Sequence, residues 1–280
     1  MNDLTAVSFS DAVGSAQLLP LWVLAIFVPL VLPMCSYLGY WTGRVKRQRL
    51  LADGNNVKPR ASEDTSTAVM ALLGLLLAFT FSFALSRAED RRHTQVEEIA
   101  AIGTAFLQAD LVAEPGRTAL RQAIAAYAET RWSDADAFVN EDLILDFVSR
   151  TVQAQEQLWP VAMAAIGGDT PAPIKTMVAG GITEVLDAHT RRYSAAVQYI
   201  PLFAKLMIFV VACTGLVLTS NSSAMNGHEF TWRNFLVAML LSVVMIVVLD
   251  FERPREGLVK LDNSQFKLLV EELNGMLDAG

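Results

Sequence analysis

Residues 65–86 read TSTAVMALLGLLLAFTFSFALS, a run of 22 residues without a charged side chain. An α-helix needs about 20 mostly apolar residues to cross the hydrocarbon core of a bilayer. The whole chain of 280 residues agrees with this, because 53% of it is hydrophobic and only 18% is charged, against about 25% charged residues in soluble domains. The stretch therefore predicts a transmembrane helix in an integral membrane protein.

Three other apolar runs predict three further membrane helices. The first covers residues 18–41, and no basic residue precedes it, which argues against a cleaved signal peptide. The third covers residues 199–220 and has Lys205 near its start, and the fourth covers residues 234–251 and includes Asp250 near its end. Four transmembrane spans are expected.

The region between the second and third spans, residues 87–198, has the mixed composition of an ordinary helical domain. Apolar residues recur in it at spacings of three and four, which is typical of helices that bury one face: Val96, Ile99, Ile102, Phe106 and Ala109; Leu120, Ile124 and Tyr127; Val178, Ile182 and Val185. No charged or proline-rich break separates Ser86 from this region, so the second span is predicted to continue as one helix to about Val112.

The predicted fold is all-α: an integral membrane protein with four transmembrane helices and a helical extramembrane domain between helices 2 and 3. The remaining parts are an N-terminal segment (1–17), a basic loop (44–64) and a C-terminal segment (252–280). From Arg44 to Arg60 six basic residues stand against Asp53 alone. Short basic loops stay in the cytoplasm, which predicts a cytoplasmic loop 44–64 and a helical domain 87–198 on the other side, in the periplasm.

Four spans bring several charged residues to the same face of the membrane. These junction residues are Arg87, Lys205, Asp250 and Arg253. An unpaired charge at the edge of an apolar run is costly, so Lys205 and Asp250 are predicted to pair, directly or through Arg253. The alternative is that each side chain reaches water separately.

The sequence offers little catalytic chemistry. It contains no phosphate-binding glycine loop, no zinc-binding histidine pair and no nucleophile motif; no enzyme activity, cofactor or metal site is expected. The net charge of -7 argues against nucleic acid as a partner. Glu97 and Glu98 resemble a solvated helix face, and Cys35 and Cys213 are expected to be packing residues without a structural disulfide.

The second span carries two distinct stripes. Leu72, Leu75, Leu76, Phe79 and Phe83 form a bulky apolar one, and Gly74, Ala78, Ser82 and Ser86 form one of small side chains. Small residues let membrane helices approach closely, and rings of bulky apolar side chains gate pores by dewetting. The bulky stripe is therefore a candidate pore lining, with ordinary contact to lipid as the alternative.

Four segments carry a resemblance to a known family: LGLLLAFTFSFALSR (73–87), AEDRR (88–92), VEEIAAIG (96–103) and LDFERPREG (249–257). They resemble the bestrophin-like domain family of bacterial membrane proteins, over residues 65–275. More distantly, a Phe eight residues before an Arg is similar to the neck of bestrophins, pentameric ion channels with four membrane helices per subunit. The resemblance implies that Leu72, Leu75 and Phe79 lie at or near a neck.

The sequence departs from the bestrophin pattern in two ways. Bestrophins have an aromatic residue just after the Arg, where this chain has Ala88-Glu89-Asp90. The resemblance also implies a cytoplasmic domain between spans two and three, opposite to the orientation that the basic loop predicts.

Two hypotheses for function result. The first is a bestrophin-like homo-oligomeric ion channel of the bacterial inner membrane, a pentamer by resemblance, with an apolar constriction on the second span and with itself, lipids and ions as partners. The second is a non-conducting membrane sensor or scaffold whose helical domain binds a partner or an envelope component.

Overall fold

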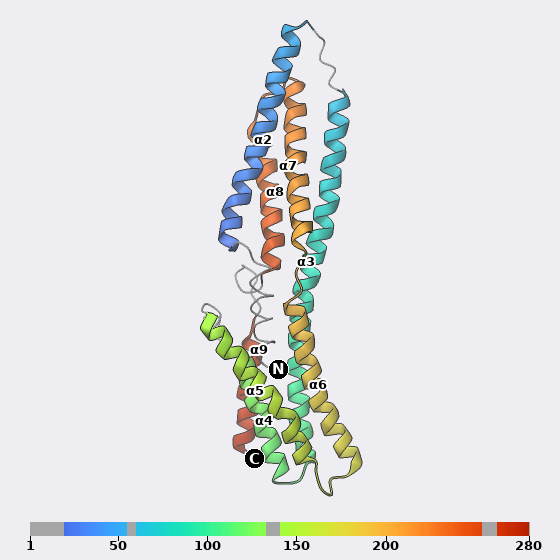
Figure 1. The fold of residues 1–280 in the computed structure, drawn as a ribbon, viewed down its shortest axis with the longest axis vertical. Coiled ribbons are helices and arrows are strands. Elements are labelled where there is room, and N and C mark those ends of the chain that lie inside the picture. The colour runs from blue at the N-terminus through green and yellow to red at the C-terminus, as the bar shows by residue number, and fades with distance from the viewer. Residues whose placement is uncertain (1–19, 55–59, 133–140, 254–261, 280) are drawn as a thin grey trace. The chain divides into compact units, whose positions relative to one another are not determined.

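The computed structural model describes residues 20–54, 60–132, 141–253 and 262–279, and it is helical in every regular element of these ranges (Figure 1). The N-terminal segment 1–17, Lys58 and residues 254–257 of the last motif lie outside them. The elements are α2 (Leu21–Ala52), α3 (Arg60–Gln108), η1 (Ala109–Leu111), α4 (Gly116–Arg131), α5 (Glu141–Ala165), α6 (Ala172–Ala196), α7 (Leu202–Met225), α8 (Trp232–Phe251) and α9 (Ser264–Ala279). The predicted all-α class is confirmed.

The chain divides into two compact units. The membrane unit contains α2, the part of α3 up to Ala88, α7 and α8, and the second unit contains α3 from Glu89 onward, η1, α4, α5, α6 and α9. Helix α3 belongs to both, because it runs for 49 residues without a break. The prediction that the second span continues as one helix is confirmed.

Four helices in the described residues are long and apolar enough to cross a membrane: α2, α3, α7 and α8. This agrees with the four predicted spans. The first helix, however, continues to Ala52, so Arg44, Lys46 and Arg49 lie on a helix and not in the loop that was expected from residue 44. The residues after Arg44 favour helix, and α2 ends only where Gly54 adopts a positive φ of 71°.

Helices α2 and α7 touch each other at the backbone. A Cβ atom on Gly39 would lie 2.4 Å from the carbonyl oxygen of Val217, and one on Gly43 would lie 2.6 Å from that of Asn221. The hydroxyls of Ser36 and Ser220 form a buried hydrogen bond of 2.7 Å within the same contact. Two glycines four residues apart are a recognised means of close approach between membrane helices, and this spacing in α2 was a sequence signal that the prediction did not use.

Apolar side chains from all four helices fill the centre of the membrane unit. They are Val28 and Leu32 of α2, Leu73 of α3, Ile208, Ala212 and Leu216 of α7, and Ala238 and Met245 of α8. The outer faces of the bundle are apolar as well, since Trp22, Phe203 and Trp232 are among its most exposed side chains. Such a surface is suited to lipid.

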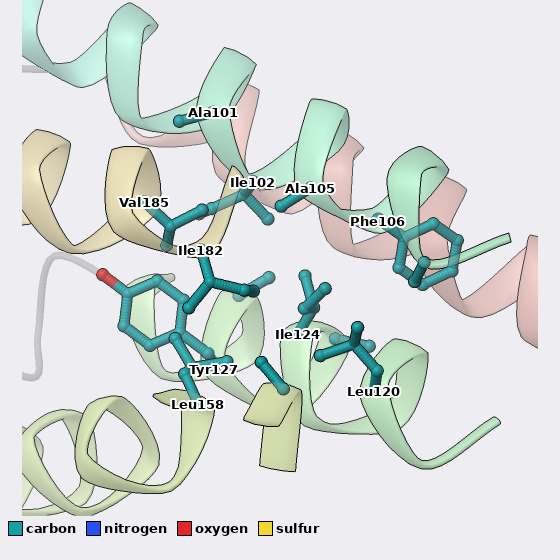
Figure 2. Packing of buried hydrophobic residues seen from close by; sticks show 14 of the residues in the cluster. Ala101, Ile102, Ala105, Phe106, Leu120, Ile124, Tyr127, Leu158, Ile182 and Val185 are labelled. Atoms are coloured by element: carbon teal, nitrogen blue, oxygen red, sulfur yellow. The ribbon is translucent and has the colours of Figure 1, made fainter. Parts of the chain in front are cut away.

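The second unit has a core of its own, formed by α3, α4, α5, α6 and α9. Figure 2 shows its centre, where Ile102 and Phe106 of α3 and Ile182 of α6 lie with side chains of α4 and α5. The predicted inward residues of α4 (Leu120, Ile124, Tyr127) and α6 (Val178, Ile182, Val185) are all buried. The stripe predicted on α3 is correct for Ile102, Phe106 and Ala109, but Val96 is 46% exposed.

Two further features concern single helices. Helix α5 continues through Pro160 to Ala165. Pro160 and Glu156, whose carbonyl loses its helical partner, are both exposed, so water can bind the freed carbonyl. The C-terminal segment, for which no helix was predicted, forms α9, and Phe266, Leu269 and Leu273 pack into the core at helical spacing.

The close contact between α2 and α7 predicts that Gly39→Ala destabilises the protein. The added methyl group meets main-chain atoms of Val217, which cannot turn aside, so the helices must separate at a cost of about 1–3 kcal/mol. Thermal unfolding in detergent should show a lower Tm. Gly180→Ala is the control, because nothing lies within 4 Å of a Cβ at Gly180 in the interior of α6; a Tm for Gly39→Ala at or above that of the control would contradict the contact.

Candidate functional site: the face of α3 and the charged clusters

The bulky stripe of α3 is largely uncovered by the rest of the chain. Leu72, Leu75, Phe79 and Phe83 are 50%, 53%, 56% and 64% exposed. Leu76, the fifth residue predicted to line a pore, is only partly exposed and packs against the membrane core. The helical period explains the difference, because Leu76 lies at the edge of the stripe that is nearest to the inward residue Leu73.

Helix α3 is attached to the membrane unit by another face. Leu73 and Ala84 are buried there, and Met70 and Leu73 reach Gly215 of α7. The small-residue stripe from Gly74 to Ser86 is exposed as well, and nothing lies within 4 Å of a Cβ built on Gly74. Among the described residues of one chain, therefore, the small stripe and the bulky stripe other than Leu76 are left largely uncovered.

One of the predicted junction charges has a partner that the sequence analysis did not name. Lys205 pairs with Glu252, the residue directly after α8, with its Nζ 2.6 Å from Glu252 Oε2. The backbone N–H of Ile200 donates a second hydrogen bond of 2.8 Å to Glu252. The pairing of Lys205 with Asp250, directly or through Arg253, stays a prediction. Glu252 comes at the end of α8, where its longer side chain reaches the start of α7.

The other junction residues lie in the same unit. Asp250 and Arg253 are buried, with 6% and 8% of their surface exposed, and Arg87 is partly buried. Their burial agrees with the expectation that charges at the ends of these spans are not freely solvated.

A buried charged cluster in the second unit was missed by the sequence analysis. Glu98 of α3, expected on a solvated face, is fully buried. Its carboxylate accepts hydrogen bonds from the Tyr127 hydroxyl (2.7 Å), from Arg131 Nε (2.8 Å) and from an Arg192 terminal nitrogen (2.8 Å). His189 Nδ1 lies 3.6 Å from Glu98 and 3.1 Å from the Tyr127 hydroxyl oxygen.

This Glu98 cluster joins four helices. Tyr127 and Arg131 come from α4, and His189 and Arg192 come from α6. The Arg192 guanidinium also lies over the ring of Phe266 in α9, 4.6 Å from its centre. A carboxylate can accept several hydrogen bonds at once, so one acidic side chain on α3 holds two neighbouring helices directly and a third through Arg192.

The electrostatics of the cluster favour an ionised Glu98. Burial alone would raise the pKa of this carboxyl, but Arg131, the contact with His189 and Arg192 outweigh it and hold the pKa far below its ordinary value. Burial, together with the two arginines, lowers the pKa of His189 in spite of the nearby carboxylate. Burial raises the pKa of the Tyr127 hydroxyl. Glu98 is thus a permanent anion at neutral pH, and Tyr127 a neutral donor.

A signal for the burial of Glu98 was present in the spacing. Glu98 precedes Ile102 by four residues and Ala105 by seven, so it continues the buried stripe of α3, whereas Glu97 does not. What the sequence did not reveal is which cations would meet it, because Arg131 and Arg192 belong to other helices. Among the described residues no group of three or more His, Cys, Asp or Glu side chains is placed to hold a metal ion.

The Glu98 cluster predicts unequal effects of substituting adjacent glutamates. Glu98→Gln removes the charge that compensates two buried arginines, and should destabilise the protein by about 3–5 kcal/mol. Glu97→Gln is the matched control, since Glu97 is partly exposed and lies 3.5 Å from the exposed Arg191, a kind of pair worth about 0–1 kcal/mol. Thermal unfolding of both variants checks this, and equal Tm values would refute the role of Glu98.

Comparison with known proteins identifies the architecture. No family model and no curated protein matches the sequence. Solved structures do match: a bacterial bestrophin homologue from Klebsiella pneumoniae superposes with a TM-score of 0.65 at 13% identity, covering 90% of this chain and 98% of that one. Two single-residue variants of that homologue also match at 13% identity. One gives a TM-score of 0.64 and covers 90% of this chain and 98% of its own. The other gives a TM-score of 0.65 and covers 91% of this chain and 97% of its own.

The match extends over nearly the whole length of both chains, and it includes the membrane helices as well as the second unit. The resemblance that the sequence motifs indicated is therefore present in the fold. At this level of identity the likeness concerns architecture alone. The chain is a four-span, all-helical membrane protein with the fold of a bacterial bestrophin homologue.

Proposed function

We propose that the protein is a homo-oligomeric ion channel in which α3 of each subunit lines the pathway. The observation that carries the proposal is the uncovered bulky stripe of α3, with Leu72, Leu75, Phe79 and Phe83 each at least half exposed. The bestrophin-like fold supports it, because the resemblance seen in the sequence implies a pentameric channel with four membrane helices per subunit.

The second stripe of α3 supplies the contact that such an assembly needs. Gly74, Ala78, Ser82 and Ser86 lie beside the bulky stripe, about a quarter-turn around the helix at 3.6 residues per turn. A neighbouring subunit that packs on these small side chains would come close to the α3 backbone. The adjacent bulky stripe would then face the axis of the assembly, with Leu76 at its edge.

The mechanism follows from the side chains that would surround this axis. Repeated around a ring, Leu72, Leu75 and Phe79 offer no hydrogen-bonding group to an ion or to its water shell. A narrow apolar ring of this kind opposes conduction by expelling water, and widening it or making it more polar restores a wet path. The proposed constriction lies at these residues, with Phe83 one turn further along α3.

The proposal predicts that Phe79→Ala changes the conductance of protein reconstituted in planar bilayers. Removing a ring of phenyl groups widens and wets the constriction, so the unitary current or the open probability should rise several-fold. Phe235→Ala is the matched control, because Phe235 of α8 is 51% exposed against 56% for Phe79 but lies on another span. Its conductance should equal that of the unmodified protein.

Two results would overturn the channel proposal. One is the absence of conductance in any salt, and the other is an equal response to both phenylalanine substitutions. A monomer or dimer in detergent, with the α3 stripe reacting with lipid-soluble labels, would favour the alternative of a non-conducting sensor or scaffold.

The proposed orientation places the end of α2 in the cytoplasm of a bacterial cell and the second unit in the periplasm. Its support is the charge of the last turns of α2, where Arg44, Lys46, Arg47 and Arg49 follow the exposed Trp41. Basic residues directly after a span are retained on the cytoplasmic side, and aromatic residues such as Trp41 favour the interface itself.

This orientation predicts the behaviour of reporters fused after residue 280. Alkaline phosphatase, which folds only in the periplasm, should be active there, and green fluorescent protein should be dark. The same reporters fused after Asp53 should give the opposite pair of results and serve as the control. A fluorescent, phosphatase-inactive C-terminus would refute the charge argument and support the orientation that the bestrophin resemblance implies.

A further inference from the structure

The chain has two cysteines, Cys35 on α2 and Cys213 on α7, and the fold brings them together. They lie far apart in the sequence, within different membrane spans. The fold nevertheless places their side chains next to each other. Both are free thiols and both are partly buried, so the pair is neither an existing disulfide nor sealed within the core.

The register of the two helices explains why the cysteines meet. Cys35 precedes Gly39 by four residues, and Cys213 precedes Val217 by four. Residues four apart lie on the same side of a helix, and Gly39 is in contact with Val217. One turn before that contact, the same two sides of the helices therefore present Cys35 and Cys213 to each other.

Contacts on both sides of the cysteines hold this register. On one side, Phe27 stacks on Phe209 with ring centres 6.0 Å apart. On the other, the hydroxyls of Ser36 and Ser220 bond at 2.7 Å. A disulfide needs Cα atoms about 4.4–6.8 Å apart, and the backbone contact of Gly39 with Val217 one turn away holds the two helices in close approach.

We propose that Cys35 and Cys213 are a redox-active pair that a lipid-soluble quinone oxidises to a disulfide, which locks α2 to α7. Both S–H bonds break and one S–S bond forms. The two electrons and both protons pass to the quinone, which becomes the hydroquinone. An oxidant of this class fits the position of the pair, since quinones dissolve in the hydrocarbon that surrounds the spans and the reaction leaves no net charge there.

The reaction is tested on the purified full-length protein in lipid nanodiscs. The probe is a benzoquinone with every ring position substituted, so that thiols cannot add to the ring. After treatment, the chains are denatured and their free thiols are counted with a maleimide reagent. We expect the count to fall from two per chain to nearly none, with a Cys35–Cys213 peptide in the mass spectrum, chains that stay monomeric on a non-reducing gel, and full recovery with dithiothreitol.

A matched variant tests whether the contact between α2 and α7 is responsible for the formation of the disulfide. Cys35→Ala combined with Leu30→Cys keeps two cysteines, but Leu30 is 62% exposed and lies on the opposite side of α2. This variant should form no disulfide bond within the chain. The proposal is overturned if both thiols of the natural chain remain free after treatment, if its disulfides form only between chains, or if the variant forms an internal bond equally well.

Discussion

The rest of the structure depends on one constraint, that the single helix α3 must contribute buried side chains to two different cores. Its buried residues include Leu73, Ala84, Gln95, Glu98 and Ile102, and they follow one another at distances of three, four or eleven residues. All of these distances return to the same side of an α-helix. The backbone N–H and C=O groups hydrogen-bond to one another along the whole helix, as those of a chain in lipid must. Only the side chains therefore change between the two units.

One buried carboxylate in each unit meets partners from other parts of the chain. Glu98 is surrounded by donors from α4 and α6, and Glu252 accepts from Lys205 and from the backbone of Ile200. A buried carboxylate is tolerated only when it is paired and fully hydrogen-bonded. These clusters therefore fix helix positions in a way that apolar contacts, which have no direction, do not.

Much of the fold was predictable because it rests on local patterns. Uncharged runs of sufficient length predicted four spans, and the absence of a break after Ser86 predicted a continuous helix. The inward residues of α4 and α6 followed from their spacing. The burial of Glu98 was missed because this residue was assigned from its neighbours in sequence, whereas its partners come from distant helices. For the exposed stripe of α3, the pattern identified the residues but not what faces them.

From the amino-acid sequence alone one obtains the fold class, the number of spans, the excess of basic residues after the first span and the two stripes of α3. All of these depend on composition and helical period, which act over a few turns. The tertiary structure alone decided which side of α3 stays uncovered, which cations compensate Glu98 and which thiol meets Cys35. Those contacts join residues from separate helices, and their geometry depends on how closely the helices approach, as Gly39 allows against Val217.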